Sequence, residues 1–236
     1  MTVLATESQY SRLASLVKFS DTPEYFQFHT KAVVAYESGT PTYTLGTVMG
    51  AYVDTPVGTA GTTVGTGNGV MGAITVTSVP GLELGTYTLK IIKANTNAGD
   101  FQLRSPSGKL VGNGTVAVAF AQDAFAFTLA DGSSDFVVGD TIPIVVTGTV
   151  QYKAAVATAT DGSQIPVALY MGDSFGAIKD TVMVATTATN IMVINRGKVI
   201  VSKDALVLDT SYSTTAAKNN AYAALGVQGI LVEASN

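Results

Sequence analysis

From position 165 to the C-terminus, short β-branched apolar runs alternate with clusters of small polar residues. Residues 182–184 and 191–194 are such runs, and Thr186-Thr187-Ala188-Thr189-Asn190 separates them. This alternation is typical of strands and turns. It predicts strands at residues 165–171, 182–194, 197–201, 205–208 and 229–233.

One stretch in this half of the chain favours a helix. Ser213-Thr214-Thr215 offers hydroxyls for an N-cap, and residues 216–225 are rich in helix formers. Gly226 stands where a left-handed C′ residue would end the helix. Ala217, Ala221 and Leu225 recur at helical spacing, so we expect this narrow face of mostly small residues to pack closely on a sheet.

The N-terminal part predicts an arm followed by strands. Residues 1–19 lack a clear period, which indicates an arm, residues 1–22, that is mobile alone and ordered on a partner. Strands are expected at residues 25–29, 32–36 and 45–50, with a turn at Glu37-Ser38-Gly39-Thr40-Pro41.

The middle of the chain has a different texture. Residues 55–69 are nearly all Gly, Thr, Val, Pro and Ala, which is typical of a linker or extended loop. Strand-like runs then follow at regular spacing, without a helical pattern, and predict a small β-sandwich at residues 55–149. The expected strands are residues 72–79, 85–93, 100–103, 114–119, 125–129 and 141–150.

Composition narrows the classes of function. Only 13% of the residues are charged, against about a quarter in typical globular proteins, while 47% are hydrophobic. So little charge suggests that much of the surface is either rich in Ser, Thr and Gly or covered by partners, and flat, uncharged strand edges tend to aggregate when they are left exposed. A net charge of −4 without any basic run argues against nucleic-acid binding. The absence of cysteine excludes disulfides and thiolate metal sites, and we expect neither a secretory leader nor a membrane span.

One motif could suggest catalysis. Gly172-Asp173-Ser174-Phe175-Gly176 matches the Gly-x-Ser-x-Gly nucleophile elbow and follows a strand-like run. A serine nucleophile needs a base, and the single histidine, His29, lies far upstream, opposite to the chain order of that fold. We therefore interpret the motif as a polar turn and expect no catalytic residues.

Three further patterns favour structural roles. Gly67-Asn68-Gly69-Val70-Met71-Gly72 fits a dinucleotide fingerprint but lacks the preceding strand and following helix, which predicts a flexible junction without a cofactor. Asp131, Asp135 and Asp140 could be proposed as Ca²⁺ ligands, yet their spacing does not match an EF-hand loop, so we expect solvated turns and no metal. Asn113-Gly114-Thr115 matches a glycosylation acceptor, which carries no meaning without secretion.

Several segments, in their order, resemble the phage-lambda-type head decoration (capsid cement) proteins. They are residues 160–170 (TDGSQIPVALY), 196–201 (RGKVIV) with 203–206 (KDAL), an alanine-rich helix, and 225–232 (LGVQGILV). In that family a strand like Gly46-x-Val48-x-Gly50 leads after a brief turn into a segment like residues 152–161. Here residues 54–150 intervene.

The resemblance implies a mainly β fold: a split decoration-protein domain, residues 23–54 and 150–236, with one short C-terminal helix and an inserted Ig-like β-sandwich. It also implies a virion structural protein, not an enzyme, that binds the outer surface of the mature capsid and stabilises it against internal DNA pressure. The implied partners are the major capsid protein and other copies of the chain, as a homotrimer. The expected capsid contacts are arm residues Leu4, Tyr10, Leu13 and Leu16.

Two alternatives remain open. A virion adhesin or tail-associated protein would bind glycans or receptors through the sandwich, and would need an exposed aromatic platform. Trp is absent, and the Phe residues of the middle segment alternate like core positions. An esterase would depend on Ser174.

Overall fold

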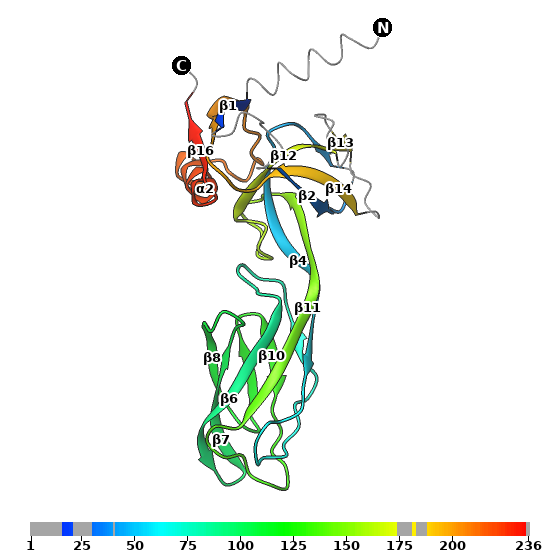
Figure 1. Ribbon diagram of the computed structural model, residues 1–236, viewed down its shortest axis with the longest axis vertical. Helices are drawn as coiled ribbons and strands as arrows, with labels where there is room; N and C mark the ends of the chain where they lie inside the picture. Colours follow the sequence, from blue (N-terminus) through cyan, green and yellow to red (C-terminus); the bar gives the residue numbers. More distant parts are fainter. Residues whose placement is uncertain (1–15, 21–29, 40, 174–180, 183–187, 235–236) are drawn as a thin grey trace. The chain divides into compact units, whose positions relative to one another are not determined.

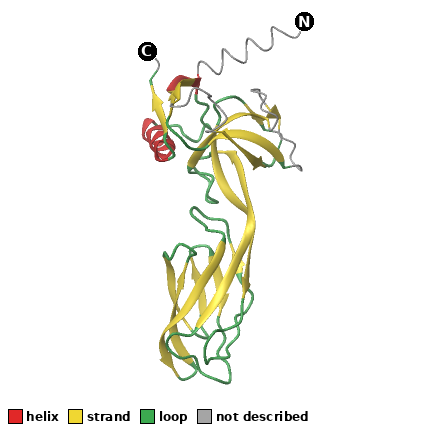
Figure 2. Cartoon of the chain, viewed as in Figure 1, coloured by secondary structure: helices red, strands yellow, loops and turns green. Residues whose placement is uncertain are grey.

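The computed structural model describes residues 16–20, 30–39, 41–173, 181–182 and 188–234 (Figures 1 and 2). The expected fold class is confirmed: the chain is mainly β, with a short helix near the C-terminus. It divides into two compact units. Unit 1 comprises Met1–Tyr52 and Val150–Asn236, and unit 2 comprises Val53–Thr149.

Unit 1 contains a ring of five strands. In order around the ring they are β2 (Thr30–Ala35), β14 (Thr189–Ile194), β12 (Pro166–Asp173), β4 (Val48–Ala60) and β11 (Thr141–Ala154). Tyr152 in β11 pairs with Ala35 in β2, and the Tyr36 N–H donates to the Tyr152 carbonyl at 3.1 Å, which closes the ring. Such closure removes the strand edges that would otherwise be exposed. The ring surrounds a core that includes Tyr43, Met49, Tyr170, Ile191 and Val193.

A second layer of unit 1 covers the ring. β1 (Val17–Ser20), β15 (Val199–Ser202) and β16 (Ile230–Glu233) form a three-stranded sheet, and α2 (Thr215–Val227) packs against β16 and β12. A short β3 (Thr42–Tyr43) pairs with β13 (Thr181–Val182). The core of this layer includes Leu16, Leu169, Val201, Leu225 and Ile230.

The helix begins where the sequence predicts and ends later. Thr214 Oγ1 accepts a hydrogen bond from the Ala217 N–H at 3.1 Å, which confirms the expected N-cap. The predicted stop at Gly226 is wrong, because α2 continues through Gly226 to Val227. The left-handed residue is Gly229, with φ of 83°. A Cβ at Gly229 would meet the backbone of Gly197, so the close approach of these two segments requires glycine there.

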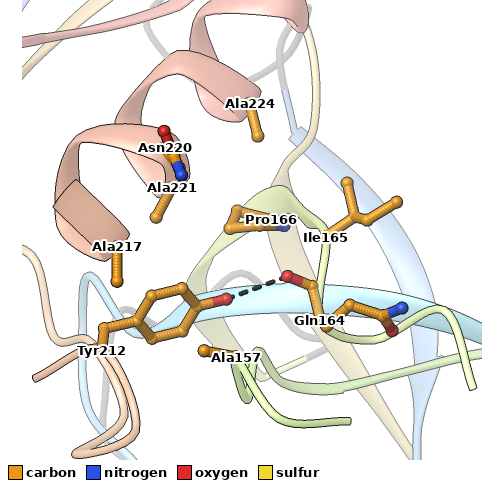
Figure 3. Close-up of a pocket in the computed structure, with 9 residues that line it drawn as sticks. All are labelled: Ala157, Gln164, Ile165, Pro166, Tyr212, Ala217, Asn220, Ala221 and Ala224. Atoms are coloured by element: carbon orange, nitrogen blue, oxygen red, sulfur yellow. Dashed lines mark hydrogen bonds between the residues drawn. The ribbon is translucent and has the colours of Figure 1, made fainter. Parts of the chain in front are cut away.

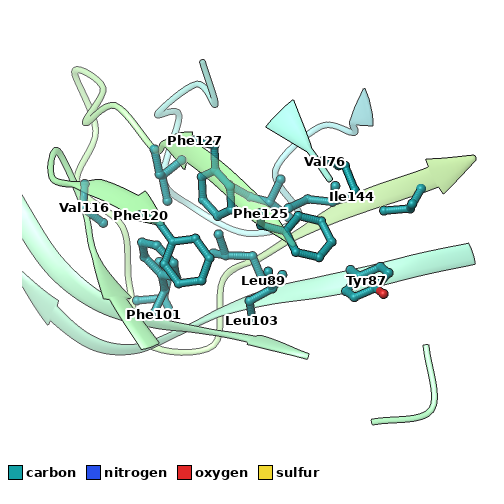
Figure 4. Packing of buried hydrophobic residues seen from close by; sticks show 14 of the residues in the cluster. Val76, Tyr87, Leu89, Phe101, Leu103, Val116, Phe120, Phe125, Phe127 and Ile144 are labelled. Atoms are coloured by element: carbon teal, nitrogen blue, oxygen red, sulfur yellow. The ribbon is translucent and has the colours of Figure 1, made fainter. Parts of the chain in front are cut away.

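Unit 2 consists of two sheets that face each other. The larger continues from β4 and β11 into β6 (Gly85–Asn95), β7 (Ala98–Arg104) and β8 (Leu110–Thr115). The smaller has the order β5 (Thr75–Val76), β10 (Phe125–Thr128), β9 (Ala119–Gln122). Apolar side chains from both sheets meet in one core, where the rings of Phe120 and Phe127 lie 4.8 Å apart (Figure 4).

Four strand and linker predictions are corrected by the structure. Residues 55–69 are not a linker, because β4 extends to Ala60 and, within unit 2, the N–H groups of Gly61 and Val64 donate to β11 carbonyls at 2.8 Å. The expected strand 72–79 is reduced to β5. The expected strand 182–194 is not continuous, because Ala188 lies outside any strand; β13 and β14 are its described strands. Residues 205–208 form no strand: the 3-10 helix η1 (Lys203–Ala205) precedes an isolated bridge between Val207 and Thr47. The strand expected at residues 25–29 lies outside the described residues.

The strand expected at residues 114–119 is also wrong, because a corner occupies that position. β8 ends at Thr115, β9 begins at Ala119, and Ala117 has a positive φ of 62°. Alternating Val and Ala gave this stretch the pattern of a strand. The N–H groups of Val116 and Ala117 instead bond to the carbonyls of Gly99 and Leu129, at 2.8 and 2.7 Å, and these long-range bonds override the local pattern.

Candidate functional site

The structure places one of the four expected capsid contacts in the core. Leu16 is only 1% exposed and packs in the same cluster as Leu225 and Ile230. The prediction that Leu16 belongs to an exposed arm is therefore wrong, because its apolar side chain packs in the core of unit 1. Leu4, Tyr10 and Leu13 lie outside the described residues.

A groove of about 380 Å³ lies between α2 and the residues that lead into β12 (Figure 3). Small helix residues form one wall, and Gln164, Ile165 and Pro166 form the facing one. The Tyr212 hydroxyl donates to the Gln164 carbonyl at 3.0 Å, which fixes the base of the groove. Burial and the nearby Asp209 carboxylate raise the pKa of Tyr212, so its hydroxyl remains a donor. The full lining is Ala157, Gln164, Ile165, Pro166, Tyr212, Ala217, Asn220, Ala221 and Ala224.

The lining of this groove provides a shape into which a side chain can fit, but no charged group. Its side chains include neither a carboxylate nor a cation, and the one hydroxyl, on Tyr212, is already bonded. Such a surface can accept an apolar side chain of a partner. The sequence carried a signal for it, since the small residues Ala217, Ala221 and Ala224 leave room beside the helix, but the facing segment around Ile165 could not be inferred.

A more polar groove of about 600 Å³ lies beside α2 as well. Lys203 and Lys218 line it together with Asp204 and Asp209, so its formal charges balance. The Lys203 ammonium lies 5.5 Å from the centre of the Tyr222 ring, within the range of a cation–π contact. Both grooves lie beside α2 and share Tyr212 in their linings.

The residues of the nucleophile-elbow motif are only partly described. Gly172 and Asp173 belong to the end of β12, so a strand does precede the motif. Ser174 and His29 lie outside the described residues. The interpretation as a polar turn therefore stays a prediction.

The three candidate metal ligands do not form a cluster among the described residues. Asp140 is 3% exposed and accepts three backbone N–H bonds, from Thr66 at 3.1 Å, Gly67 at 2.9 Å and Val137 at 3.0 Å. Burial opposes its ionisation, but these three bonds outweigh that effect and lower the pKa of Asp140. Asp135 accepts from the Asn97 N–H at 3.0 Å. The Asp140 carboxylate thus has a structural role, because it holds three backbone N–H groups together. It is not the solvated turn carboxylate that the sequence predicts.

The same contacts correct the flexible junction expected at residues 67–72. Asp140 holds the backbone of Thr66 and Gly67, and a Cβ at either Gly67 or Gly69 would overlap the Phe136 ring. These glycines therefore let the chain pack on a buried aromatic side chain. Asn113, the candidate glycosylation acceptor, lies exposed on β8.

The aromatic residues of unit 2 are all internal. Residues 53–149 are described throughout and contain one Tyr and five Phe, each at most 5% exposed: Tyr87, Phe101, Phe120, Phe125, Phe127 and Phe136. Glycan binding by stacking needs an exposed ring. The aromatic platform that an adhesin would need is absent from unit 2. In the part of the chain that the structure describes, no helix is long and apolar enough to cross a membrane.

Comparison with known proteins does not place the chain in a family. No family model and no curated protein matches it. Two crystal structures of Xanthomonas campestris FlgL match weakly. One is 18% identical over 46% of this chain and 34% of that chain, with a TM-score of 0.29; the other is 16% identical over 52% and 33%, with a TM-score of 0.27. The chain thus spans about a third of those FlgL chains, and at such TM-scores the likeness defines neither fold nor function.

Proposed function

We propose that this chain is a phage head decoration protein that binds the outer surface of the mature capsid and stabilises it against internal DNA pressure. One observation carries the proposal. The segments that resemble the decoration family, separated in sequence, contribute to one compact core: Leu169 from β12, Val199 and Val201 from β15, and Leu225 and Ile230 at the end of the chain. In this role the major capsid protein is the partner, and the chain acts as a homotrimer in the virion.

The position of unit 2 supports the interpretation of a split domain. Its two ends continue into β4 and β11, which are neighbouring strands. Just outside unit 2, the Tyr52 hydroxyl donates to Gln151 Oε1 at 2.8 Å, and the Ala155 N–H donates to the Val48 carbonyl at 2.9 Å. A short turn between these strands, as in the family, would replace unit 2 without altering the pairing, and domain insertion is tolerated at such sites.

Many modest contacts suffice for this role. A cement protein acts through symmetric copies whose small interfaces add up over the shell, and it needs no active site. The low charge of the chain and the grooves beside α2 suit such contacts. An adhesin would need exposed aromatic rings, and the aromatic residues of unit 2 are buried, so this observation does not favour the adhesin.

The copy number of the chain in virions tests the proposal. Quantitative mass spectrometry of gradient-purified particles is expected to give about one copy per major capsid protein, because a decoration protein follows the symmetry of the shell. A portal or tail protein in the same particles provides the low-copy control. A few copies per particle would instead indicate a tail-associated protein, and absence from the particles would contradict both roles.

Capsid binding through the arm is a second testable prediction. Alanine at Leu4, Tyr10 and Leu13 together should reduce the amount bound to capsids by at least about tenfold, the equivalent of one lost apolar anchor. Thermal unfolding should not change, because the described core begins at Leu16. A matched variant with alanine at Thr6, Ser8 and Ser11 should bind normally. Full binding by the first variant, measured by co-sedimentation with capsids, would rule out these contacts.

A further inference from the structure

Two edge strands follow each other in unit 2. β8 is the last strand of the larger sheet and pairs with β7, and β9 is the last strand of the smaller sheet and pairs with β10. All residues from 53 to 149 are described, and neither strand pairs with a further strand. An edge strand directs alternate backbone N–H and C=O groups outward, where an added strand can bond to them.

The corner at residues 116–118 holds the two edges on one side of unit 2. Val116 is 2% exposed, and its N–H donates to Gly99 in β7. The Ala117 N–H donates to Leu129, the residue that follows β10. The corner is thus tied to both sheets. We call residues 110–122 the β8–β9 edge; the label β8 marks it in Figure 1.

The β8–β9 edge lacks the residues that usually protect an exposed edge. Residues 110–122 contain no Asp, Glu, Lys, Arg or Pro, and the nearest charges, Lys109 and Asp123, lie just outside it. Leu110 and Val118 are 45% and 55% exposed. Natural sheets place Lys, Pro or a covering element on their edges to prevent pairing with other chains. An edge of this composition indicates a strand that is covered by a partner.

We propose that β8 pairs, antiparallel and about a two-fold axis, with β8 of a second copy of this chain. The larger sheets of the two copies then form one continuous sheet. This pairing depends on unit 2 alone, so it holds whether or not the chain coats a capsid.

Charge selects a second copy as the occupant. In a two-fold pair the same strand lies on both sides, so a charged β8 would face its own charge. An uncharged β8 is compatible with itself and offers nothing to attract a basic or an acidic partner. When Asn113 faces Asn113 of the second copy, antiparallel pairing also places the two Lys109 residues at opposite ends, about 27 Å apart, beyond the range of strong repulsion.

Cysteine cross-linking tests the pairing directly, because the native chain has no cysteine. Leu110→Cys, Asn113→Cys and Thr115→Cys report along β8 in the full-length protein. Thr88→Cys is the matched control, since Thr88 is exposed on β6, an interior strand of the same sheet. Under mild oxidation or with a short bis-maleimide, β8 variants should form dimers, with the highest yield where the register brings two Cβ atoms within disulfide reach.

The outcomes separate the possible occupants. A yield at the best β8 position at least about tenfold above that of Thr88→Cys supports the pairing. Equal yields, or no dimer from any β8 position, overturn it. A photoreactive maleimide on Asn113→Cys should label residues 110–115 of a second copy; labelling of unit 1 or of another protein would identify a different occupant and also overturn the proposal.

A charge variant provides an independent measurement. Asn113→Lys should weaken self-association in sedimentation velocity by about tenfold, because two lysines then face each other across the pair. Thr88→Lys adds the same charge to the same unit and should leave it unchanged. Leu110→Lys is the second edge variant if the first unfolds. A wild-type chain that stays monomeric at all concentrations, or an Asn113→Lys variant that associates normally, contradicts the proposal.

Discussion

Replacing Gly50 with alanine is expected to destabilise unit 1 by about 3 kcal/mol or more, because it overpacks a site bounded by backbone. Gly50 lies in β4 opposite Pro166 in β12, and a Cβ there would overlap the backbone carbonyl of Ser163. Backbone cannot rotate away as a flexible side chain can. The substitution therefore forces a shift of the whole turn around Ser163.

That turn is held firmly in place. Asp161 Oδ1 accepts the Ser163 hydroxyl at 2.6 Å and the Ser163 N–H at 3.0 Å, and the Lys153 ammonium lies 2.7 Å from Asp161 Oδ2. Burial would raise the pKa of Asp161, but these bonds outweigh it and lower the pKa. Moving the turn would disturb this partly buried network, which is costly.

Segment-resolved hydrogen exchange measures this effect. Peptides of unit 1 should lose protection in Gly50→Ala, while those of unit 2 retain it, since the units are separate compact bodies. Gly226→Ala is the matched control: Gly226 is helical with open space around its Cβ position. That variant should gain about 0.5–1 kcal/mol from helix propensity. A Gly50→Ala protein as stable as the wild type would contradict the argument.

Removing the Asp140 carboxylate should destabilise unit 2 by about 3 kcal/mol at neutral pH. In Asp140→Ala, three backbone N–H groups lose their acceptor, and each buried donor left unsatisfied costs about 1–3 kcal/mol, offset in part by water entry. The effect should appear in exchange from residues 61–70 and 137–141, which Asp140 joins. Asp123→Asn, at an exposed turn with φ of 52° that Asn also tolerates, is the control and should be nearly neutral.

The contribution of Asp140 should also depend on pH in a defined direction. Its pKa in the folded state is lowered from the ordinary 3.8, so the folded state binds its proton less readily than the unfolded state. The stabilisation is therefore fully present above pH 3.8 and is lost as the pH falls through the folded pKa. Comparison with Asp140→Asn by thermal unfolding should show a gap that is constant near neutrality and narrows in acid. A gap independent of pH would exclude the ionised carboxylate as its source.

Local sequence patterns were sufficient to predict elements whose structure depends mainly on their own residues. Alternation over residues 85–93 predicted β6, and the Phe residues at 125 and 127 read as core positions and are buried. The hydroxyls of Ser213, Thr214 and Thr215 predicted the start of α2, and Thr214 is the N-cap. The change of texture near residues 54 and 150 suggested an insert at 55–149, and the compact unit 2 extends from Val53 to Thr149.

Sequence patterns gave wrong predictions where contacts with residues distant in the sequence determine the structure. Gly/Thr-rich residues 61–69 read as a linker because the carboxylate that holds them, on Asp140, lies 73 residues from Gly67. Leu16 read as an exposed arm residue because its partners in the core, such as Leu225 and Ile230, come from the other end of the chain. Nothing local marks the pairing of Tyr152 with Ala35 that closes the ring. These features depend on tertiary contacts that propensity does not encode.

The adjacent ends of unit 2 have a practical consequence. Because Tyr52 and Gln151 lie within hydrogen-bond distance on neighbouring strands, the chain leaves and re-enters unit 1 at almost the same point. A foreign domain whose own termini lie about 5 Å apart, the spacing of paired strands, could be grafted there in place of unit 2. Unit 1 thus provides an insertion site for different domains. Selection or engineering can exchange the inserted domain without changing the residues that stabilise unit 1.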